Sequence, residues 1–317
     1  MSKFSNTKLL LILVALAAVI AIVKYLDVSK GERNFRSELV KIDTAKISSI
    51  YIYPKSKKGQ EVKLFRENGQ WKVRVNENKN QNVDYSRISG LFKTITGIKP
   101  VRLAARNMEK WKDFEVDTSG TRVKVHEGDK KTLDIIIGKM NFIGGRDVET
   151  FVRLDNETET YAVSGFLDAT FNTGIDEWRD KTLIKNGKDK WLKLAFALAD
   201  TMRFQLEKQD TVWILDGMPA NQTEVNNYLS SVSHVMGTAF ADDLDASTLG
   251  SAQYLLEIED TTGSKIKVEG FVVGDKKILR SSLNTDNLIN GSQGGVFERI
   301  FVSRQKFMPP ADTAASP

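Results

Sequence analysis

The chain has 317 residues, of which 41% are hydrophobic and 27% charged, a composition typical of folded globular domains. Its formal net charge of +5 is too small a surplus on this length to indicate nucleic-acid binding by itself. The sequence contains no cysteine, which excludes disulfides, thiolate metal sites, a cysteine nucleophile and a lipid-modified cysteine.

An unbroken apolar run extends from Leu9 to Val23, with a lysine on either side. Carried on to the next leucine, the run predicts a transmembrane helix of about 27 Å, close to the thickness of a bilayer core. No cleavage motif follows, so we expect an uncleaved anchor at 9–26; a cleaved signal peptide and a buried core helix are the alternatives. Because the head at 1–8 is short, we expect it to be cytoplasmic and the rest of the chain periplasmic, at a bacterial inner membrane.

Polar and charged residues at 27–45 predict a stalk, and alternating apolar residues within 46–165 predict a first module made mainly of strands. Asn68-Gly69 separates two such runs and predicts a hairpin turn. One helix is expected in this module, with Asp84 as its N-cap and Gly97 as its stop signal. Its apolar residues follow the i, i+3, i+4, i+7 spacing of one helix face: Ile88, Leu91, Phe92 and Ile95.

A charged segment at 166–190 predicts a connector between two modules. It contains an aromatic residue among charges, in the run Trp178, Arg179, Asp180 and Lys181. Two interpretations stay open. Trp178 packs in the seam between the modules while Arg179 and Asp180 pair with charges on either side, or Trp178 is an exposed hot spot for a partner protein.

Residues 191–305 repeat the order of the first module, with Trp213 in the place of Trp71 and a second helical pattern after it. The offset between corresponding positions stays between about 133 and 142 residues, which indicates an internal duplication, with chance similarity as the alternative. A polar loop is expected at 218–221. The tail at 306–317 is small, polar and proline-rich, which predicts disorder.

The short turns between strands predict antiparallel pairing. We therefore expect an α+β fold, in which an N-terminal transmembrane helix is followed by two similar modules, each a mainly antiparallel sheet with one covering helix.

No catalytic or metal-binding constellation is visible in the sequence. The two histidines, His126 and His234, lie in different modules, and neither has a partner at metal-ligand spacing. Gly138-Lys139 looks like the end of a phosphate-binding loop, but Met140 stands where serine or threonine is required. We therefore expect no catalytic residue, cofactor or metal, and a protein that is not an enzyme.

Charge is distributed unevenly, because basic residues crowd the first hairpins whereas 240–262 holds carboxylates without lysine or arginine. One interpretation is a basic face that meets anionic lipid headgroups or an acidic partner; the simpler one is two solvated edges whose lysines prevent aggregation. The candidate basic face comprises Lys55, Lys57, Lys58, Lys63, Arg66, Lys72 and Arg74.

The sequence resembles the uncharacterised bacterial family called domain of unknown function 4340. The resemblance rests on Trp178 to Leu183, on Trp213 to Leu215 with Pro219 to Asn221, and on a helix after each tryptophan-containing strand, and it covers most of residues 45–305. It implies an accessory envelope component encoded near ABC-2-type permeases, including the gliding-type systems of Bacteroidota. It implies no activity, cofactor or catalytic residue.

Two triplets, Asp43-Thr44-Ala45 and Asp312-Thr313-Ala314, resemble the O-glycosylation acceptors of that phylum, with chance occurrence as the alternative.

Three functions remain open from the sequence. The leading hypothesis is a membrane-anchored, extracytoplasmic binding or scaffold subunit of an envelope ABC-type or gliding-type system, acting through protein contacts and not through nucleic acid. The alternatives are an extracytoplasmic hydrolase of glycan or peptide, and a module that binds a soluble ligand in the cleft between the repeats. Converging carboxylates or a Ser–Lys pair in a concave pocket would favour the hydrolase.

Overall fold

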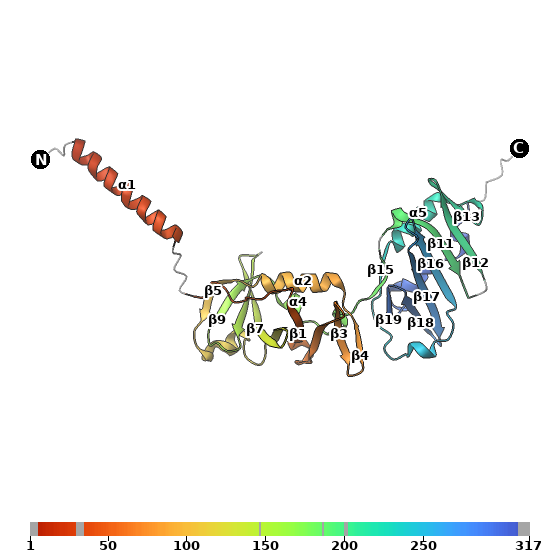
Figure 1. The fold of residues 1–317 in the computed structure, drawn as a ribbon, viewed down its shortest axis with the longest axis horizontal. Helices are drawn as coiled ribbons and strands as arrows, with labels where there is room; N and C mark the ends of the chain where they lie inside the picture. Colours follow the sequence, from red (N-terminus) through yellow and green to blue (C-terminus); the bar gives the residue numbers. More distant parts are fainter. Residues whose placement is uncertain (1–5, 30–34, 146, 186, 200–201, 310–317) are drawn as a thin grey trace.

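The computed structural model describes residues 6–29, 35–145, 147–185, 187–199 and 202–309. Helix α1 (Asn6–Ser29) precedes two sheet modules. The modules lie end to end along the long axis of the molecule (Figure 1). As the short turns predicted, the fold is built mainly from antiparallel sheets with few helices.

The predicted transmembrane anchor is not found as a spanning helix. No helix among the described residues is both long enough and apolar enough to cross a membrane. The side chains of Leu9 and Val23, the predicted ends of the anchor, lie outside the described ones, which run without a gap only from 12 to 22.

The first module is a nine-stranded antiparallel sheet with the strand order β4-β3-β2-β1-β6-β7-β8-β9-β5. Its strands are β1 (Ile47–Tyr53), β2 (Val62–Glu67), β3 (Gln70–Asn76), β4 (Lys79–Asn82), β5 (Pro100–Ala105), β6 (Thr121–Glu127), β7 (Lys130–Ile143), β8 (Asp147–Leu154) and β9 (Thr160–Ser164). The turn between β2 and β3 is the predicted Asn68-Gly69, where both residues have positive φ as a two-residue hairpin of type I′ requires.

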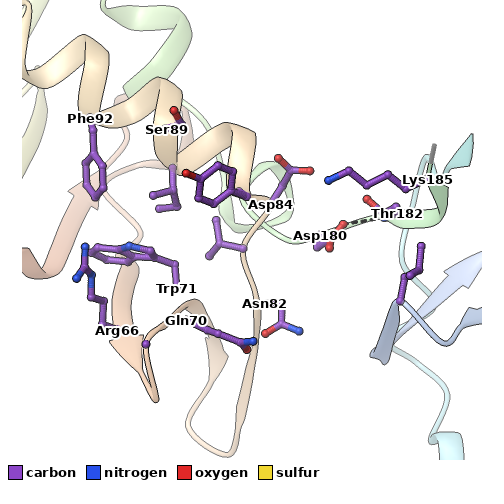
Figure 2. A pocket seen from close by; sticks show the side chains of 15 residues that line it. Arg66, Gln70, Trp71, Asn82, Asp84, Ser89, Phe92, Asp180, Thr182 and Lys185 are labelled. Atoms are coloured by element: carbon purple, nitrogen blue, oxygen red, sulfur yellow. Dashed lines mark hydrogen bonds between the residues drawn. The ribbon is translucent and has the colours of Figure 1, made fainter. Parts of the chain in front are cut away.

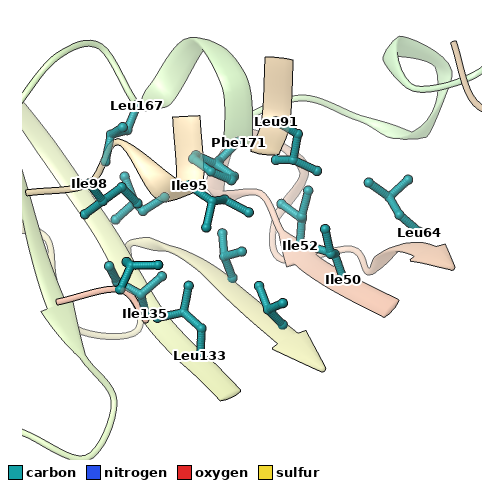
Figure 3. Close-up of a cluster of buried hydrophobic side chains, with 14 of the residues drawn as sticks. Ile50, Ile52, Leu64, Leu91, Ile95, Ile98, Leu133, Ile135, Leu167 and Phe171 are labelled. Atoms are coloured by element: carbon teal, nitrogen blue, oxygen red, sulfur yellow. The ribbon is translucent and has the colours of Figure 1, made fainter. Parts of the chain in front are cut away.

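Helix α2 (Tyr85–Thr96) covers one face of this sheet, and the short helix α4 (Asp168–Phe171) lies beside it (Figures 1 and 3). Asp84 caps α2 by accepting hydrogen bonds from the backbone amides of Ser86 and Arg87, and Gly97 is its C-cap, as predicted. The helix buries Ile88, Leu91 and Ile95 of the predicted apolar set against inward-facing strand residues. Alternation along the strands thus supplies one side of the core and helical periodicity the other.

The second module contains an eight-stranded antiparallel sheet with the order β14-β13-β12-β11-β16-β17-β18-β19, and a two-stranded sheet of β10 and β15. The strands are β10 (Thr182–Lys185), β11 (Trp191–Ala197), β12 (Arg203–Gln209), β13 (Val212–Leu215), β14 (Met218–Pro219), β15 (His234–Met236), β16 (Tyr254–Asp260), β17 (Lys265–Val273), β18 (Lys276–Ser281) and β19 (Asn284–Asn290). Helix α5 (Gln222–Val232) and the short α6 (Val296–Ile300) pack on its core, so this module has more than the one helix expected.

The two sheets share one strand order. Strands β1 to β4 correspond to β11 to β14 and strands β6 to β9 to β16 to β19, with β5 as the extra strand of the first module. Trp71 lies on β3 and Trp213 on the corresponding β13, and α2 and α5 each follow the fourth strand. The polar loop expected at 218–221 is instead the short edge strand β14, because Met218 and Pro219 pair with β13.

In both modules, the sheet face opposite the helix is covered over one half only. In the first, the segment with α3 (Trp111–Phe114) packs over β7, β8 and β9. In the second, residues of 241–252 pack over β17, β18 and β19. The outer faces of β1, β2 and β3, and of their counterparts in the second module, carry no such cover among the described residues.

Three segments that composition had assigned to linkers contribute to the cores. Leu39 and Val40 of the predicted stalk are buried in the first module. The predicted connector contains α4, strand β10 and the buried Trp178. At the start of the predicted tail, Phe307 is fully buried in the second module, whereas 310–317 lies outside the described residues.

Candidate functional site at the module seam

The two modules meet around a buried guanidinium. The side chain of Arg179 is fully buried, and it donates a forked pair of hydrogen bonds to the carboxylate of Asp242, with Nη2 2.7 Å from Oδ1. Nη1 also donates to Asp176 at 2.8 Å, and Cζ lies 3.3 Å from the ring centroid of Phe240. A planar guanidinium serves a forked carboxylate and an aromatic face at once, which the point charge of lysine does not.

Further polar contacts join the modules around this pair. Lys79 on β4 places Nζ 3.2 Å from the Asp242 carboxylate. The amide of Gln81 donates to a backbone carbonyl of β19, and the amide of Asn287 donates to the backbone carbonyl of Asp180 at 2.9 Å. The seam is therefore joined by hydrogen bonds between fixed partners, and these define the relative orientation of the modules more sharply than apolar packing would.

A cavity of about 630 Å³ opens beside these contacts (Figure 2). Its aromatic wall comes from the first module and comprises Trp71, Phe92 and Tyr85. The rings of Trp71 and Phe92 meet edge to face with centroids 5.6 Å apart, and the Arg66 guanidinium lies 5.3 Å from the Trp71 ring. Tyr85, the first residue of α2, is 81% exposed. This volume lies within the range of about 300–1,000 Å³ that is usual for binding pockets.

The opposite side of the cavity is polar and includes residues of the connector and β10. Figure 2 shows Asp84 and Lys185 pointing toward one another from different modules, with Asp180 and Thr182 below them in the view. Burial by itself would raise the pKa of Asp84, but the hydrogen bonds from Ser86 and from two backbone amides outweigh it, so the pKa is lower than usual. Asp84 is therefore a carboxylate at neutral pH.

One buried acceptor in the cavity wall lacks a partner. The side-chain oxygen of Asn82 is buried and accepts no hydrogen bond within the described parts of the chain. Such an atom costs free energy unless water or a bound molecule supplies a donor.

The structure brings three of the four connector residues to the seam. Arg179 is its central cation, the backbone carbonyl of Asp180 accepts from β19, and Lys181 lies 5.4 Å from the Phe240 ring. Trp178 is buried in the core of the first module and is not on the surface. Within the described ranges Asp180 makes no ion pair, and its carboxylate accepts from the backbone amide of Thr182.

The candidate basic face is divided. Lys63, Lys72 and Arg74 belong to the outer side of the first sheet, opposite α2. Arg66 pairs in register with Trp71 and therefore points to the α2 side. Lys55, Lys57 and Lys58 lie in the turn after β1, where Lys55 is 3.1 Å from Glu115. Successive residues of a strand point to opposite faces of the sheet, so Arg66 points away from the face that carries Lys63, Lys72 and Arg74.

Sequence reasoning missed the residues that complete the seam, namely Asp242, Phe240, Lys185 and Tyr85. Of these residues, only Asp242 belonged to a pattern noted in the sequence, the acidic run at 240–262. That run did not identify Arg179 as the partner of Asp242. His234 is exposed on β15, whereas His126 packs its ring against Tyr51 with centroids 5.2 Å apart. No group of three potential metal ligands occurs in the part of the chain that the structure describes.

The chain matches the model of a protein family. The model of the family described as domain of unknown function (DUF4340) matches residues 71–253, which is more than half of the chain. The match begins at Trp71 in the cavity wall and includes both Arg179 and Asp242 of the seam. No curated protein and no solved structure matches the chain.

Proposed function

The chain belongs to the family of the domain of unknown function 4340, and we propose that it is a binding and scaffold protein of the cell envelope, not an enzyme. Its contact site for a partner protein is the seam cavity between the two modules. The observation that carries this proposal is the aromatic wall with the exposed Tyr85, which faces the polar side formed by Asp180, Thr182 and Lys185.

The composition of the cavity supports a protein partner. Tryptophan, tyrosine and arginine are the residues most enriched at the energetic centres of protein interfaces. Here Trp71, Tyr85 and Arg66 line one hollow, with the carboxylate of Asp84 and the ammonium of Lys185 on its polar side. An extended peptide segment that presents an apolar side chain and polar main-chain groups would match both sides.

A hydrolase receives less support from the same cavity. General acid catalysis by a carboxyl group needs a raised pKa, whereas the pKa of Asp84 is lowered by the hydrogen bonds of the helix cap. Asp180 uses its carboxylate to accept from the backbone of Thr182. Both carboxylates are thus engaged in local structure.

A soluble ligand is the second candidate occupant. The volume of the cavity favours it, because it lies in the range that is usual for small-molecule sites. In this case the cavity would bind its ligand without any partner protein.

The remainder of the proposal concerns location and partner class. An inner-membrane location, with the two modules outside the cytoplasm, rests on the apolar run from Leu9 to Val23 in the sequence alone. An ABC-type permease or another subunit of a gliding-type system as partner rests on the family resemblance alone.

Photocrosslinking in cells tests the proposal. A photoreactive amino acid replaces Tyr85 in the full chain, and a matched probe replaces Val212, which is also exposed but lies on β13 of the second module. We expect one discrete protein adduct from position 85, recovered in the membrane fraction, and none from position 212. The same adducts from both positions, or none from either, would contradict a partner protein at the seam.

A substitution series distinguishes a contact from a structural effect. Because Tyr85 is largely exposed, Tyr85→Ala should leave the melting temperature unchanged and abolish co-purification of the crosslinked protein. Phe166→Ala removes an aromatic side chain that is 49% exposed and not in the cavity lining, and it should change neither property. Co-purification that survives Tyr85→Ala would remove the cavity from the proposal.

A further inference from the structure

The uncovered half of the first sheet carries cations and aromatic rings in a regular pattern. On its outer side, opposite α2, strand register aligns Lys124 of β6, Tyr51 of β1, Lys63 of β2 and Arg74 of β3. We call these four residues the cationic row. They occupy adjacent strands, so the row runs straight across the sheet.

The spacing of the row follows from sheet geometry. Neighbouring strands lie about 4.8 Å apart, which places the backbone positions of Lys124 and Lys63 about 10 Å apart with Tyr51 between them. Arg74 follows about 5 Å further on. Across the sheet, the row therefore consists of a lysine, the ring of Tyr51, a second lysine and an arginine.

The cations of the row rest against aromatic rings. Lys63 Nζ lies 5.2 Å from the ring centroid of Tyr51 and 5.8 Å from that of Phe65. Arg74 Cζ lies 6.0 Å from Phe65, and Lys124 Nζ lies 5.1 Å from Tyr53. Such contacts hold a charge in place without neutralising it.

Carboxylates do not neutralise this row. Among the described residues, none of Lys63, Arg74 and Lys124 makes an ion pair. By contrast Arg122, next to Lys124 on the outer side of β6, pairs with Asp134 at 2.8 Å. Three unpaired cations on one flat face make a local excess of positive charge, which a bound anion would neutralise.

The second module shows that the fold does not require these charges. At the corresponding positions of β16, β11, β12 and the residue after β13 it has Glu257, Ala195, Gln205 and Asp216. There, Glu257 pairs with Lys265 and Asp216 pairs with Arg304, both at 2.8 Å. The corresponding positions therefore carry carboxylates in ion pairs in the second module and unpaired cations in the first.

We propose that the cationic row binds an acidic polysaccharide, with its carboxylate or sulfate groups on Lys124, Lys63 and Arg74 and a neutral sugar ring crossing the sheet above Tyr51. The proposal is independent of the seam cavity and of its partner protein. It commits to a linear polyanion whose charges are separated by neutral rings, because that is the order of groups in the row.

Two other polyanions fit less well. A single nucleic-acid strand in a duplex carries a charge about every 3.4 Å, denser than the cations of the row. An anionic membrane surface is usually entered by apolar side chains that protrude past the basic ones. Here the lysine ammonium groups lie over the rings of Tyr51 and Tyr53, so the rings do not protrude.

The test measures binding of the full chain, in mild detergent, to hyaluronate, in which a neutral sugar ring separates successive carboxylates, with neutral dextran as the uncharged reference. Lys63→Gln with Arg74→Gln removes two cations of the row. We expect binding about tenfold weaker or more and a salt dependence shallower by about two counterions. Tyr51→Ala should weaken binding without changing the salt dependence, because it removes the ring that holds Lys63 in place and no charge.

The matched control removes the same charge from the outer face of the second module. Lys193→Gln with Lys265→Gln breaks three ion pairs with carboxylates and should leave polysaccharide binding unchanged. Equal loss in both double variants would overturn the proposal, since only net charge would then matter. Tighter binding to an oligothymidylate, or to vesicles of equal parts phosphatidylcholine and phosphatidylserine, would also overturn it.

Discussion

At the scale of single residues, Trp178 and Arg179 show how two neighbours in the chain can serve different purposes. Trp178 is 2% exposed in the core of the first module, with the Arg87 guanidinium 5.7 Å from its ring. The Arg179 side chain points the other way, to the second module. Trp178 is buried, so it is not an exposed hot spot. It packs in the core of the first module and not in the seam between the modules.

Truncation of Trp178 should cost the first module much of its stability. We expect Trp178→Ala to lower the free energy of unfolding by about 3–5 kcal/mol, because a fully buried aromatic side chain is lost. Trp178→Phe should cost less, since it keeps most of the ring volume and removes an indole N–H that has no partner among the described residues. Urea unfolding measures both, and Phe166→Ala is the exposed control. A Trp178→Ala midpoint equal to that control would show that the core tolerates the loss.

At the scale of elements, Gly138 explains how α3 comes to lie on the sheet. A β-carbon at Gly138 would lie 2.1 Å from the Phe114 carbonyl oxygen and 2.8 Å from Val116 Cγ1. The glycine sits where the pairing of β7 with β8 shifts register, and the backbone after α3 fills the space of the missing side chain. The resemblance of Gly138-Lys139 to a phosphate loop therefore has a packing explanation.

Two glycine substitutions should act in opposite directions. Gly138→Ala should lower the melting temperature, because the α3 segment must move off the sheet to make room. Gly90→Ala lies within α2, where no atom of the described residues outside the helix backbone lies within 4 Å of the new β-carbon, and it should stabilise the protein by about 1 kcal/mol through helix propensity. Differential scanning calorimetry compares them. A neutral Gly138→Ala would mean that the α3 segment is not held closely against β7.

At the scale of the whole molecule, one carboxylate connects the two modules. Asp242 accepts from Arg179 of the connector and lies 3.2 Å from Lys79 of the first sheet. Burial alone would raise the pKa of Asp242, but the hydrogen bonds and charges of Arg179 and Lys79 outweigh it, so the pKa is lowered. A lowered carboxyl pKa in the folded state stabilises the fold above the unfolded pKa, and the contribution is lost as the pH falls through the folded value.

Asp242→Asn should therefore destabilise the protein in a pH-dependent way. At pH 7 the variant should unfold at lower urea concentration than the native chain. The difference should stay constant down to about pH 5 and shrink below about pH 4, where the carboxyl group protonates in the unfolded chain while the folded chain still holds it ionised. Urea midpoints across this range measure it, with Asp243→Asn as the control for an exposed neighbouring carboxylate. A difference that persists unchanged at low pH would show that the Arg179 pairing is not its source.

The sequence by itself determined the local elements of this protein. Asp84 caps its helix through amides two and three residues away, and Asn68-Gly69 closes a hairpin between adjacent strands. Both interactions involve chain neighbours, so residue type and spacing suffice to predict them. The alternation of apolar residues likewise predicted the antiparallel sheets, because a strand presents successive side chains to opposite faces.

Only the tertiary structure decided what the modules do to one another. Arg179 and Asp242 are 63 positions apart, and Lys79 and Asp242 are 163 apart, distances over which no local pattern selects a partner. The division of the basic residues between two faces depends on strand register. The burial of Leu39, Val40 and Trp178 depends on the folded chain bringing them against the core of the first module. Long-range packing is a property of the folded surfaces together, so composition alone assigned these residues to a stalk, a connector and a single basic face.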